Sequence, residues 1–208
     1  MYIQIPYGIF EIKMKPENTK QYIIKKTAPI FNKKGYTGTY LSDITNATGL
    51  TKGSIYCNFK DKNEVAIEAF KYNLQQLNKK VNEKIKKLER ADEKLLTFIN
   101  FYKKNYKQVF KNGGCAILNT SIDADDTNDL LKREVIKALT SWKSTIENII
   151  EEGINKGCLK LVDPEKYSCK LIALIEGSIM LSKTLNNPDY LMYNLEYLEI
   201  EIKNITVK

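Results

Sequence analysis

Apolar residues recur at steps of three and four along most of this 208-residue chain, and this spacing constrains the fold more than any other feature. It is the spacing of an amphipathic helix, whereas a half-buried strand would alternate apolar and polar residues. The clearest stretch is 128–155, whose apolar face consists of Leu131, Val135, Leu139, Trp142, Ile146, Ile149 and Ile150. The chain is therefore predicted to be all-α.

Helix start and stop signals divide this pattern into about nine helices. A glycine in the left-handed conformation can end a helix, and glycines follow the expected helices at Gly35, Gly49, Gly113–Gly114 and Gly157. Asp61 and Glu64 are spaced as a capping box at the start of a long helix. Asp163-Pro164 and Asn187-Pro188 are typical of helix starts. Asp92 is expected to cap the helix that ends at Gly113–Gly114.

The composition excludes several classes of function. The absence of histidine removes Ser-His-Asp and Cys-His catalysis and His-ligated zinc. Because no carboxylate pair, phosphate loop or metal-ligand spacing stands out either, we expect no enzyme and no cofactor or metal. The densest acidic cluster lacks the glycine and glutamate of an EF-hand, so it is expected to be a solvated loop; it consists of Asp123, Asp125, Asp126 and Asp129.

The cysteines and the hydropathy favour a cytoplasmic protein. Cys57, Cys115, Cys158 and Cys169 form no C-x-x-C pair, which favours reduced thiols. No apolar run reaches the length of a membrane span, so no membrane association is expected.

Positive charge is concentrated near the N-terminus. The chain has a net charge of +8, and residues 15–62 hold nine lysines against three acidic residues, a net +6. A polyanion such as DNA is expected to meet this segment rather than the whole surface. The alternative is a chance cluster in a lysine-rich composition.

Two short predicted helices joined by Gly49-Leu50-Thr51 fit a helix-turn-helix. The glycine permits the turn, Leu50 fills the space between the helices, and Ile55 and Phe59 supply the packing side of the second helix. The groups that then face outward suit phosphates and base edges, and they belong to Thr51, Lys52, Gly53, Ser54 and Tyr56. A helical hairpin capped by polar residues would show the same pattern.

Residues 31–70 resemble the DNA-binding segment of TetR/AcrR-family transcriptional regulators. The matches, at the family's spacing, are Gly35-Tyr36, Thr39, Asp43-Ile44, Gly49-Leu50-Thr51-Lys52-Gly53, Ile55-Tyr56, Phe59, Lys62 and Val65. The resemblance implies an N-terminal three-helix DNA-binding domain and a larger C-terminal helical domain for ligand binding and dimerisation. We expect an irregular tail over 1–14, the DNA-binding domain over 15–62 and the regulatory domain over 63–208. The alternatives for residues 1–13 are a strand-like tail or a true start at Met14.

The resemblance also implies which residues meet double-stranded DNA. Lys62 would contact the backbone at the start of the long helix, and the whole expected set is Thr39, Leu41, Ser42, Thr51, Lys52, Gly53, Ser54, Tyr56, Cys57, Asn58 and Lys62. The chain departs from the family pattern at Cys57 and Asn58, so an operator sequence cannot be taken from a relative. It also departs at Thr45 and Thr48, where the family commonly has small residues.

For the regulatory domain, the resemblance implies an unknown small-molecule effector and a homodimer. The candidate ligand-lining residues are Phe98, Phe101, Tyr102, Leu118, Asn119, Trp142 and Ile146, and for any one of them a place in the core is the favoured alternative. Such a set favours an apolar or aromatic effector. The candidate dimer residues form apolar stripes on the last two helices and are Ile172, Ile175, Ile179, Leu195, Leu198 and Ile202.

The function expected from the resemblance is a sequence-specific regulator of transcription, by default a repressor that its effector releases from a pseudo-palindromic operator. The alternative is a DNA-binding protein of the same fold without an effector, acting constitutively or through a protein partner. A slight response to ligands and DNA binding without sequence preference would distinguish this alternative from a ligand-controlled regulator.

Overall fold

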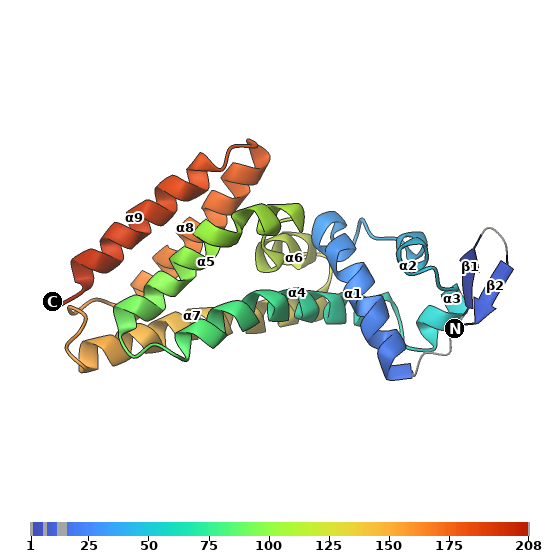
Figure 1. The fold of residues 1–208 in the computed structure, drawn as a ribbon, viewed down its shortest axis with the longest axis horizontal. Helices are drawn as coiled ribbons and strands as arrows, with labels where there is room; N and C mark the ends of the chain where they lie inside the picture. Colours follow the sequence, from blue (N-terminus) through green and yellow to red (C-terminus); the bar gives the residue numbers. More distant parts are fainter. Residues whose placement is uncertain (1, 6–7, 12–15, 208) are drawn as a thin grey trace. The chain divides into compact units, whose positions relative to one another are not determined.

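The computed structural model describes residues 2–5, 8–11 and 16–207. These residues form nine helices and one pair of strands (Figure 1). The elements are β1 (Tyr2–Ile5), β2 (Gly8–Glu11), α1 (Pro16–Lys34), α2 (Leu41–Thr48), α3 (Lys52–Tyr56), α4 (Lys62–Ile85), α5 (Ala91–Lys111), α6 (Ala116–Ala124), α7 (Asp129–Asn155), α8 (Pro164–Thr184) and α9 (Asp189–Ile205). Apart from the strand pair, the predicted all-α fold of nine helices is confirmed.

The strand pair lies where the sequence predicted an irregular tail. β1 and β2 are antiparallel, with Tyr2 opposite Glu11 and Ile5 opposite Gly8. Both strands are rich in β-branched and aromatic residues, which favour extended backbone. The strands differ from an irregular tail and agree with the strand-like alternative, and the remaining residues of the tail, 1, 6–7 and 12–14, lie outside the described part of the chain.

The predicted stop and start signals act as expected around the short helices. Gly35 and Gly49 end α1 and α2 with φ angles of +71° and +68°. The Gly49 N–H donates to the Thr45 carbonyl at 2.8 Å. At the start of α4, Asp61 accepts from the Glu64 N–H at 3.0 Å, and the Glu64 carboxylate accepts from the Lys60 N–H at 2.7 Å. These contacts fix where α1 and α2 end and where α4 begins.

Among the later helices, the predicted cap of α5 is wrong, and the predicted start of α9 is shifted by one residue because Pro188, not Asn187, is its N-cap. Asp163 caps α8 as expected, because its carboxylate accepts from the Lys166 N–H at 3.1 Å. By contrast, α5 begins at Ala91, after Arg90, and the Arg90 side chain makes no cap hydrogen bond. Asp92 lies inside the first turn, where its carboxylate pairs with the Arg90 guanidinium at 3.0 Å.

The described chain divides into two compact units. Unit 1 contains residues up to 75 together with 116–135, and unit 2 contains 76–115 together with 136 onward. This division differs from the predicted boundary between residues 62 and 63. The reason is the core of unit 1, which includes Val65 of α4, Ala124 of α6 and Leu131 of α7. The predicted boundary followed the DNA-binding motif and so separated these residues from their core.

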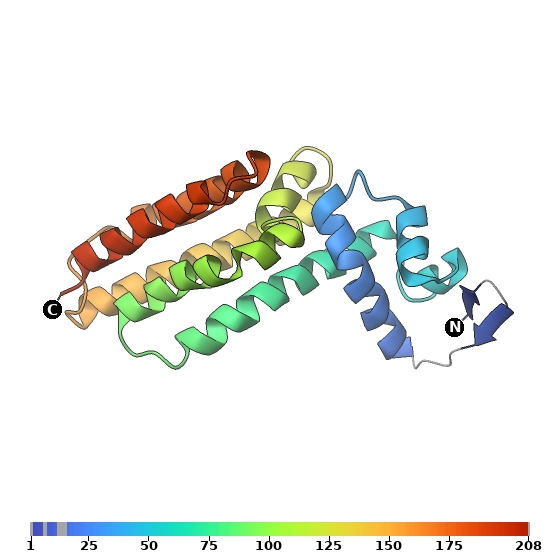
Figure 2. The same ribbon diagram turned by 45° about the horizontal axis from the view of Figure 1, so that its top comes forward.

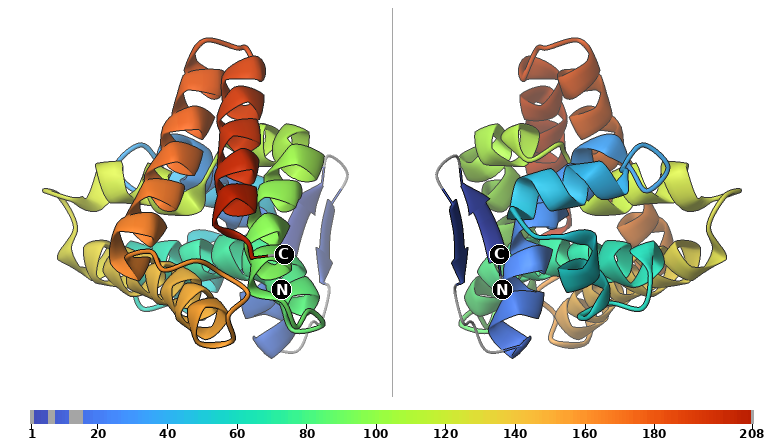
Figure 3. Two further views of the ribbon diagram at one scale, coloured as in Figure 1. Left: turned by 90° about the vertical axis from the view of Figure 1, so that its left-hand side faces the viewer. Right: turned by 90° about the vertical axis from the view of Figure 1, so that its right-hand side faces the viewer.

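In unit 2, α9 packs against both α8 and α5 (Figure 3). Five of the six predicted dimer residues are at most 1% exposed and belong to this chain's own core, and they are Ile175, Ile179, Leu195, Leu198 and Ile202. Ile172 is only partly exposed. The apolar stripes therefore form no outer surface, because the packing of α9 against α8 and α5 buries them. None of the helices described has the length and apolar character needed to cross a membrane.

Gly153 shows how tightly the end of α7 packs in unit 2. A Cβ at this position would lie 2.5 Å from the Ala91 Cβ and 2.6 Å from the Leu159 Cδ1. Such close approaches force neighbouring atoms to shift.

Gly153→Ala is therefore expected to lower the free energy of unfolding by about 1–3 kcal/mol, measured by urea denaturation. Glu151→Ala, at an exposed position of the same helix, serves as the control and should stay within about 0.5 kcal/mol of the parent protein. Equal stability of the two variants would contradict the packing described.

Candidate nucleic-acid interface

The helix α3 is held in unit 1 by three apolar side chains. Leu50, in the turn before it, is 3% exposed, Ile55 is fully buried and Phe59 is 2% exposed. They join a core that also contains Ile23 of α1 and Ile44 of α2. Figure 2 shows α2 and α3 beside each other in this unit. The helix-turn-helix predicted from the sequence is present, with the apolar side of α3 facing inward.

The opposite side of α3 is exposed. Thr51 caps the helix, its hydroxyl oxygen accepting from the Ser54 N–H at 3.2 Å. The predicted contact residues that remain exposed are Lys52, Gly53, Tyr56 and Cys57. Ser54 and Asn58 are partly exposed, and the Asn58 amide donates to the Ser54 carbonyl at 2.9 Å. This face offers one ammonium, a hydroxyl-bearing ring and bare backbone, which are suited to phosphates and base edges.

At the start of α2 the predicted residue and the exposed residue differ. Thr39 is fully buried, and its hydroxyl donates to the Gly35 carbonyl at 2.6 Å. Its side chain therefore supports the turn, and the prediction that it contacts DNA is corrected. The next residue, Tyr40, is 68% exposed. Tyr40 was not predicted, because it falls outside the matched positions; an aromatic residue just before a helix and off its apolar stripe was the available signal.

The rest of α2 matches its expected role more closely. Ser42 is exposed and Leu41 is partly exposed. Asp43 accepts from the Tyr40 N–H at 2.8 Å and pairs with Lys34 at 2.7 Å. The hydrogen bond from Lys34, then that from the Tyr40 backbone, lowers the pKa of Asp43. Thr48, one departure from the family pattern, is buried with its hydroxyl donating to the Ile44 carbonyl.

Several lysines in the basic segment are held by protein groups, and Lys34, paired with Asp43, is one of them. The Lys62 ammonium lies 4.2 Å from the ring centroid of Tyr36, and burial lowers the pKa of Lys62. The Lys20 ammonium pairs with the Glu64 carboxylate at 2.7 Å. Lys52 and Lys60 are exposed and form no ion pair with any residue in the described ranges. The free positive charge near α3 therefore belongs to Lys52 and Lys60 more than to Lys62.

Asp123 of α6 ties the turn between α1 and α2 to the rest of unit 1. Its carboxylate accepts from the Tyr36 N–H at 2.5 Å and from the Thr37 N–H at 3.4 Å. A Cβ on Gly35 would lie 2.8 Å from the Asp123 Cγ, so glycine is needed for this approach. The prediction of a solvated acidic loop is wrong for Asp123, whose carboxylate is hydrogen-bonded to the turn between α1 and α2 in unit 1.

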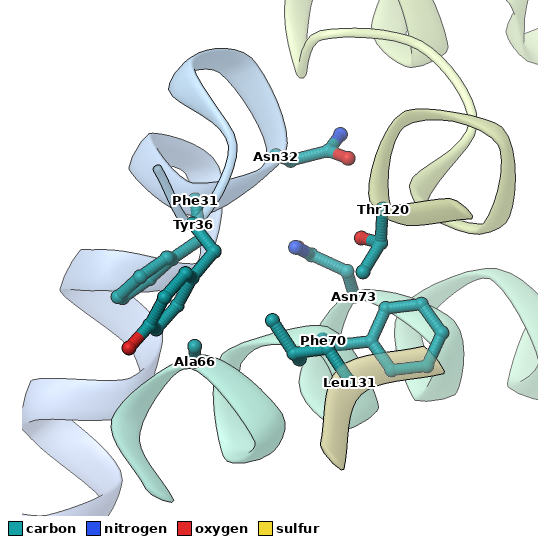
Figure 4. A pocket seen from close by; sticks show the side chains of 8 residues that line it. All are labelled: Phe31, Asn32, Tyr36, Ala66, Phe70, Asn73, Thr120 and Leu131. Atoms are coloured by element: carbon teal, nitrogen blue, oxygen red, sulfur yellow. The ribbon is translucent and has the colours of Figure 1, made fainter. Parts of the chain in front are cut away.

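A second link from α6 involves Asn119, one of the predicted ligand-lining residues. Its amide donates to the Asn32 backbone carbonyl at 2.9 Å and lies 3.2 Å from the Asn32 Oδ1. Beside it is a hollow of about 260 Å³, continuous with solvent, that Figure 4 shows from close by. It is lined by Phe31, Asn32, Tyr36, Ala66, Phe70, Asn73, Thr120 and Leu131. Most of this volume is open solvent, and the enclosed space is about 10 Å³, which is too small for a small-molecule ligand.

The predicted ligand-lining residues are distributed over both units. Leu118 and Asn119 belong to unit 1, and the other five belong to unit 2. Phe98, Phe101, Tyr102 and Ile146 are buried, whereas Trp142 is partly exposed. The rings of Phe101 and Tyr102 meet edge to face, with centroids 5.3 Å apart. Burial alone agrees with the alternative that these residues are core.

The structure adds Glu176 of α8, which the sequence reasoning missed. It is 8% exposed, and apart from the Cys115 thiol, a weak donor, its carboxylate has no hydrogen-bond partner among the residues described. Burial raises the pKa of Glu176 from 4.5 to about 7, and the Cys115 thiol opposes this shift. Burial, then the charges of Cys115 and Glu176, raises the pKa of Tyr102. An acid between Ile175 and Ile179 in an apolar stripe was the available signal.

A buried acid whose pKa is raised makes the fold less stable as pH rises. Unfolded Glu176 loses its proton near pH 4.5, but the folded protein holds it to about pH 7. The penalty is absent below pH 4.5, grows between these values and is constant above them.

We expect Glu176→Gln to gain stability relative to the parent protein across this window, by up to the order of 3 kcal/mol at pH 8. Urea denaturation from pH 4.5 to 8 measures the difference. Glu151→Gln removes an exposed carboxylate of the same unit and should show no such growth. A difference that is flat with pH would show that Glu176 is not buried as described.

No group of three or more acidic, cysteine or histidine side chains that could hold a metal ion occurs within the described residues. The four cysteines are unpaired with one another. Cys57 and Cys169 are exposed, and Cys115 is buried.

Comparisons with known proteins bear on both units. Residues 23–69 match the family described as bacterial regulatory proteins, tetR family. Residues 91–198 match the tetracyclin repressor-like C-terminal domain. The HTH-type transcriptional repressor DhaR of Mycobacterium sp. (strain GP1) is 24% identical over 169 residues, which cover 81% of this chain and 84% of DhaR.

Two solved structures are more similar. A TetR-family regulator from Cytophaga hutchinsonii is 41% identical, with a TM-score of 0.87 over 95% of this chain and 100% of its own. A TetR regulator from Chloroflexus aurantiacus J-10-FL is 30% identical, with a TM-score of 0.86 over 92% of this chain and 97% of its own. The two matched domains and these relatives show that the chain belongs to the TetR family of DNA-binding transcriptional regulators, which are not enzymes.

Proposed function

We propose that this chain is a homodimeric repressor that reads a pseudo-palindromic operator with α3 and leaves it when a small molecule binds unit 2. The observation that carries the reading role is the seating of α3. Leu50, Ile55 and Phe59 are buried in the core. Lys52 and Tyr56 are therefore left on the exposed side of α3. An exposed face of this chemistry, on a helix fixed from behind, fits the major groove.

A different set of residues supports the homodimer. The outer sides of α8 and α9 carry large apolar side chains that are 40–63% exposed, namely Met180, Leu181, Leu185, Tyr193, Tyr197 and Ile200. Large apolar side chains that are exposed in number on neighbouring helices are typical of an interaction site in soluble proteins. A second copy of the chain would cover it through a two-fold interface. These residues replace the buried stripes in the proposed dimer surface.

The chain path supports a response to a ligand. α5 belongs to unit 2, and α6, which follows it after Gly113–Gly114, belongs to unit 1. Through Asp123 and Asn119, α6 holds the end of α1 and the turn before α2. A ligand that favours one position of α6 would therefore bias the reading unit, provided that it binds the two states with different affinities.

Repression is the proposed mode because the relative from Mycobacterium is named a repressor. Selection of binding sequences from a random duplex library tests the proposal as a whole. We expect enrichment of one motif with two symmetric half-sites. Failure to enrich any sequence, even in dilute buffer, would overturn sequence-specific reading.

The salt dependence of DNA binding tests the role of Lys52. Each phosphate contact contributes a slope of about −0.9 to the log-log dependence of affinity on salt. Lys52→Ala, which removes two ammonium groups per dimer, should flatten the slope by about 2. Lys62→Ala should flatten it less, because Tyr36 holds that ammonium.

The matched control is Lys160→Ala, which removes an exposed lysine from unit 2 and should leave the slope unchanged. Fluorescence anisotropy with a selected operator, between 50 and 300 mM salt as a rough range, gives the slopes. Equal slopes for Lys52→Ala and Lys160→Ala would contradict the proposed contact.

The dimer surface predicts the effect of a double substitution. Tyr193→Glu with Tyr197→Glu places charge in the middle of the apolar surface and should yield monomers in analytical ultracentrifugation. Leu161→Glu changes a residue that is 88% exposed outside α8 and α9 and should leave the dimer intact. A dimer that survives the double substitution would exclude this surface.

A further inference from the structure

The carboxylate of Glu176 is the least satisfied buried group in unit 2. We propose that Glu176 anchors the positively charged group of a small organic effector, which packs against the aromatic side chains of α5. This inference rests on the proposed ligand response and names the class of ligand. It replaces the apolar or aromatic effector expected from the sequence with an organic ammonium ion.

The first step is the weak pairing of Glu176 within the protein. Apart from the Cys115 thiol, which is a weak donor, no group among the described residues donates a hydrogen bond to its carboxylate. The buried hydroxyls nearest in sequence serve other groups: Ser178 donates to the Leu174 carbonyl, and Ser182 accepts from the Leu191 N–H at 2.8 Å. The α8 lysine of the last turn, Lys183, donates to the Gly113 carbonyl. Acids are rarely buried without a partner, because desolvation disfavours their charged form.

The second step is the aromatic surface beside the acid. Tyr102 lies close enough for the charge of Glu176 to raise its pKa, and its ring meets the Phe101 ring edge to face. Aromatic faces attract organic cations, and a carboxylate supplies the opposite charge. A neutral apolar ligand in the same place would bury the carboxylate further without pairing it. The arrangement therefore favours a cation over an apolar effector.

The third step is the pH dependence that such a site must show. The titratable groups beside Glu176 are the Cys115 thiol, which lowers the pKa of Glu176 against the larger effect of burial, and Tyr102, whose neutral hydroxyl carries no charge between pH 6 and 8. Because the pKa of Glu176 is raised to about 7, the free site is mostly ionised at pH 8 and mostly protonated at pH 6. A bound cation prefers the ionised form, so its affinity should fall about tenfold between pH 8 and pH 6.

Calorimetry on the full chain without DNA tests the proposal. The probes are benzylammonium, phenyltrimethylammonium and spermidine, with benzyl alcohol and tert-butylbenzene as neutral counterparts. At least one cation should bind more tightly than its neutral counterpart, and about tenfold more tightly at pH 8 than at pH 6. Glu176→Gln keeps the size of the side chain and should reduce this affinity by about tenfold or more. Glu151→Gln, an exposed control, should leave it unchanged.

The proposal is overturned if no cation binds, if neutral counterparts bind as tightly, or if Glu176→Gln binds cations as well as the parent protein does. Glu176→Gln is expected to fold, since it removes a buried charge, and its urea denaturation confirms this before titration. Release of a selected operator is measured separately. A cation that binds without releasing DNA contradicts the proposed function and not the site. A neutral compound that releases DNA while no cation binds contradicts the cation site and not the proposed function.

Discussion

The burial of one side of α3 is the constraint on which the rest of unit 1 depends. A five-residue helix is too short to be stable alone, so its position must come from packing. Ile55 and Phe59 supply that packing, and Leu50 closes the turn in front. The Thr51 hydroxyl then caps the first turn of α3 by accepting from the Ser54 N–H, which is a contact between residues close in sequence. With one side fixed in this way, the other side is presented rigidly, as a reader of base edges requires.

The same core explains why unit 1 does not end with the DNA-binding motif. Ala124 and Leu131 complete it from α6 and α7, and Asp123 holds the turn before α2 through two backbone N–H groups. The reading unit is thus built partly from chain that the sequence pattern assigned to regulation. A change in α6 therefore acts on the reading unit directly. This is the physical basis of the proposed ligand response.

Local signals in the sequence were sufficient for the helices and for most of the reading face. Gly35, Gly49 and the capping box of Asp61 and Glu64 act as their residue types predict. Long-range packing was not available from the pattern. An apolar stripe does not say which helix covers it, so Ile175 and Leu198 were expected at a dimer surface and lie in the core.

Polar partners were equally hidden when they came from distant parts of the chain. The Asp123 carboxylate accepts from the Tyr36 N–H although the two residues are 87 positions apart in the sequence, and no local pattern around either residue predicts this contact. Thr39 matched the family pattern, but its hydroxyl is used by the Gly35 carbonyl. Glu176 was overlooked because a single acid in an apolar stripe is usually assumed to reach solvent, and here the packing around α8 prevents that.

Alkylation of Cys57 tests most directly whether α3 enters a DNA groove. Cys57 is exposed at the end of α3, and Cys169, exposed on α8, is an internal control in the same molecule. Iodoacetamide labelling is followed by mass spectrometry with and without a saturating duplex selected by the protein. A groove-bound α3 predicts that DNA slows the labelling of Cys57 and leaves that of Cys169 unchanged. Equal labelling of Cys57 in the free and bound protein would show that another surface holds the DNA.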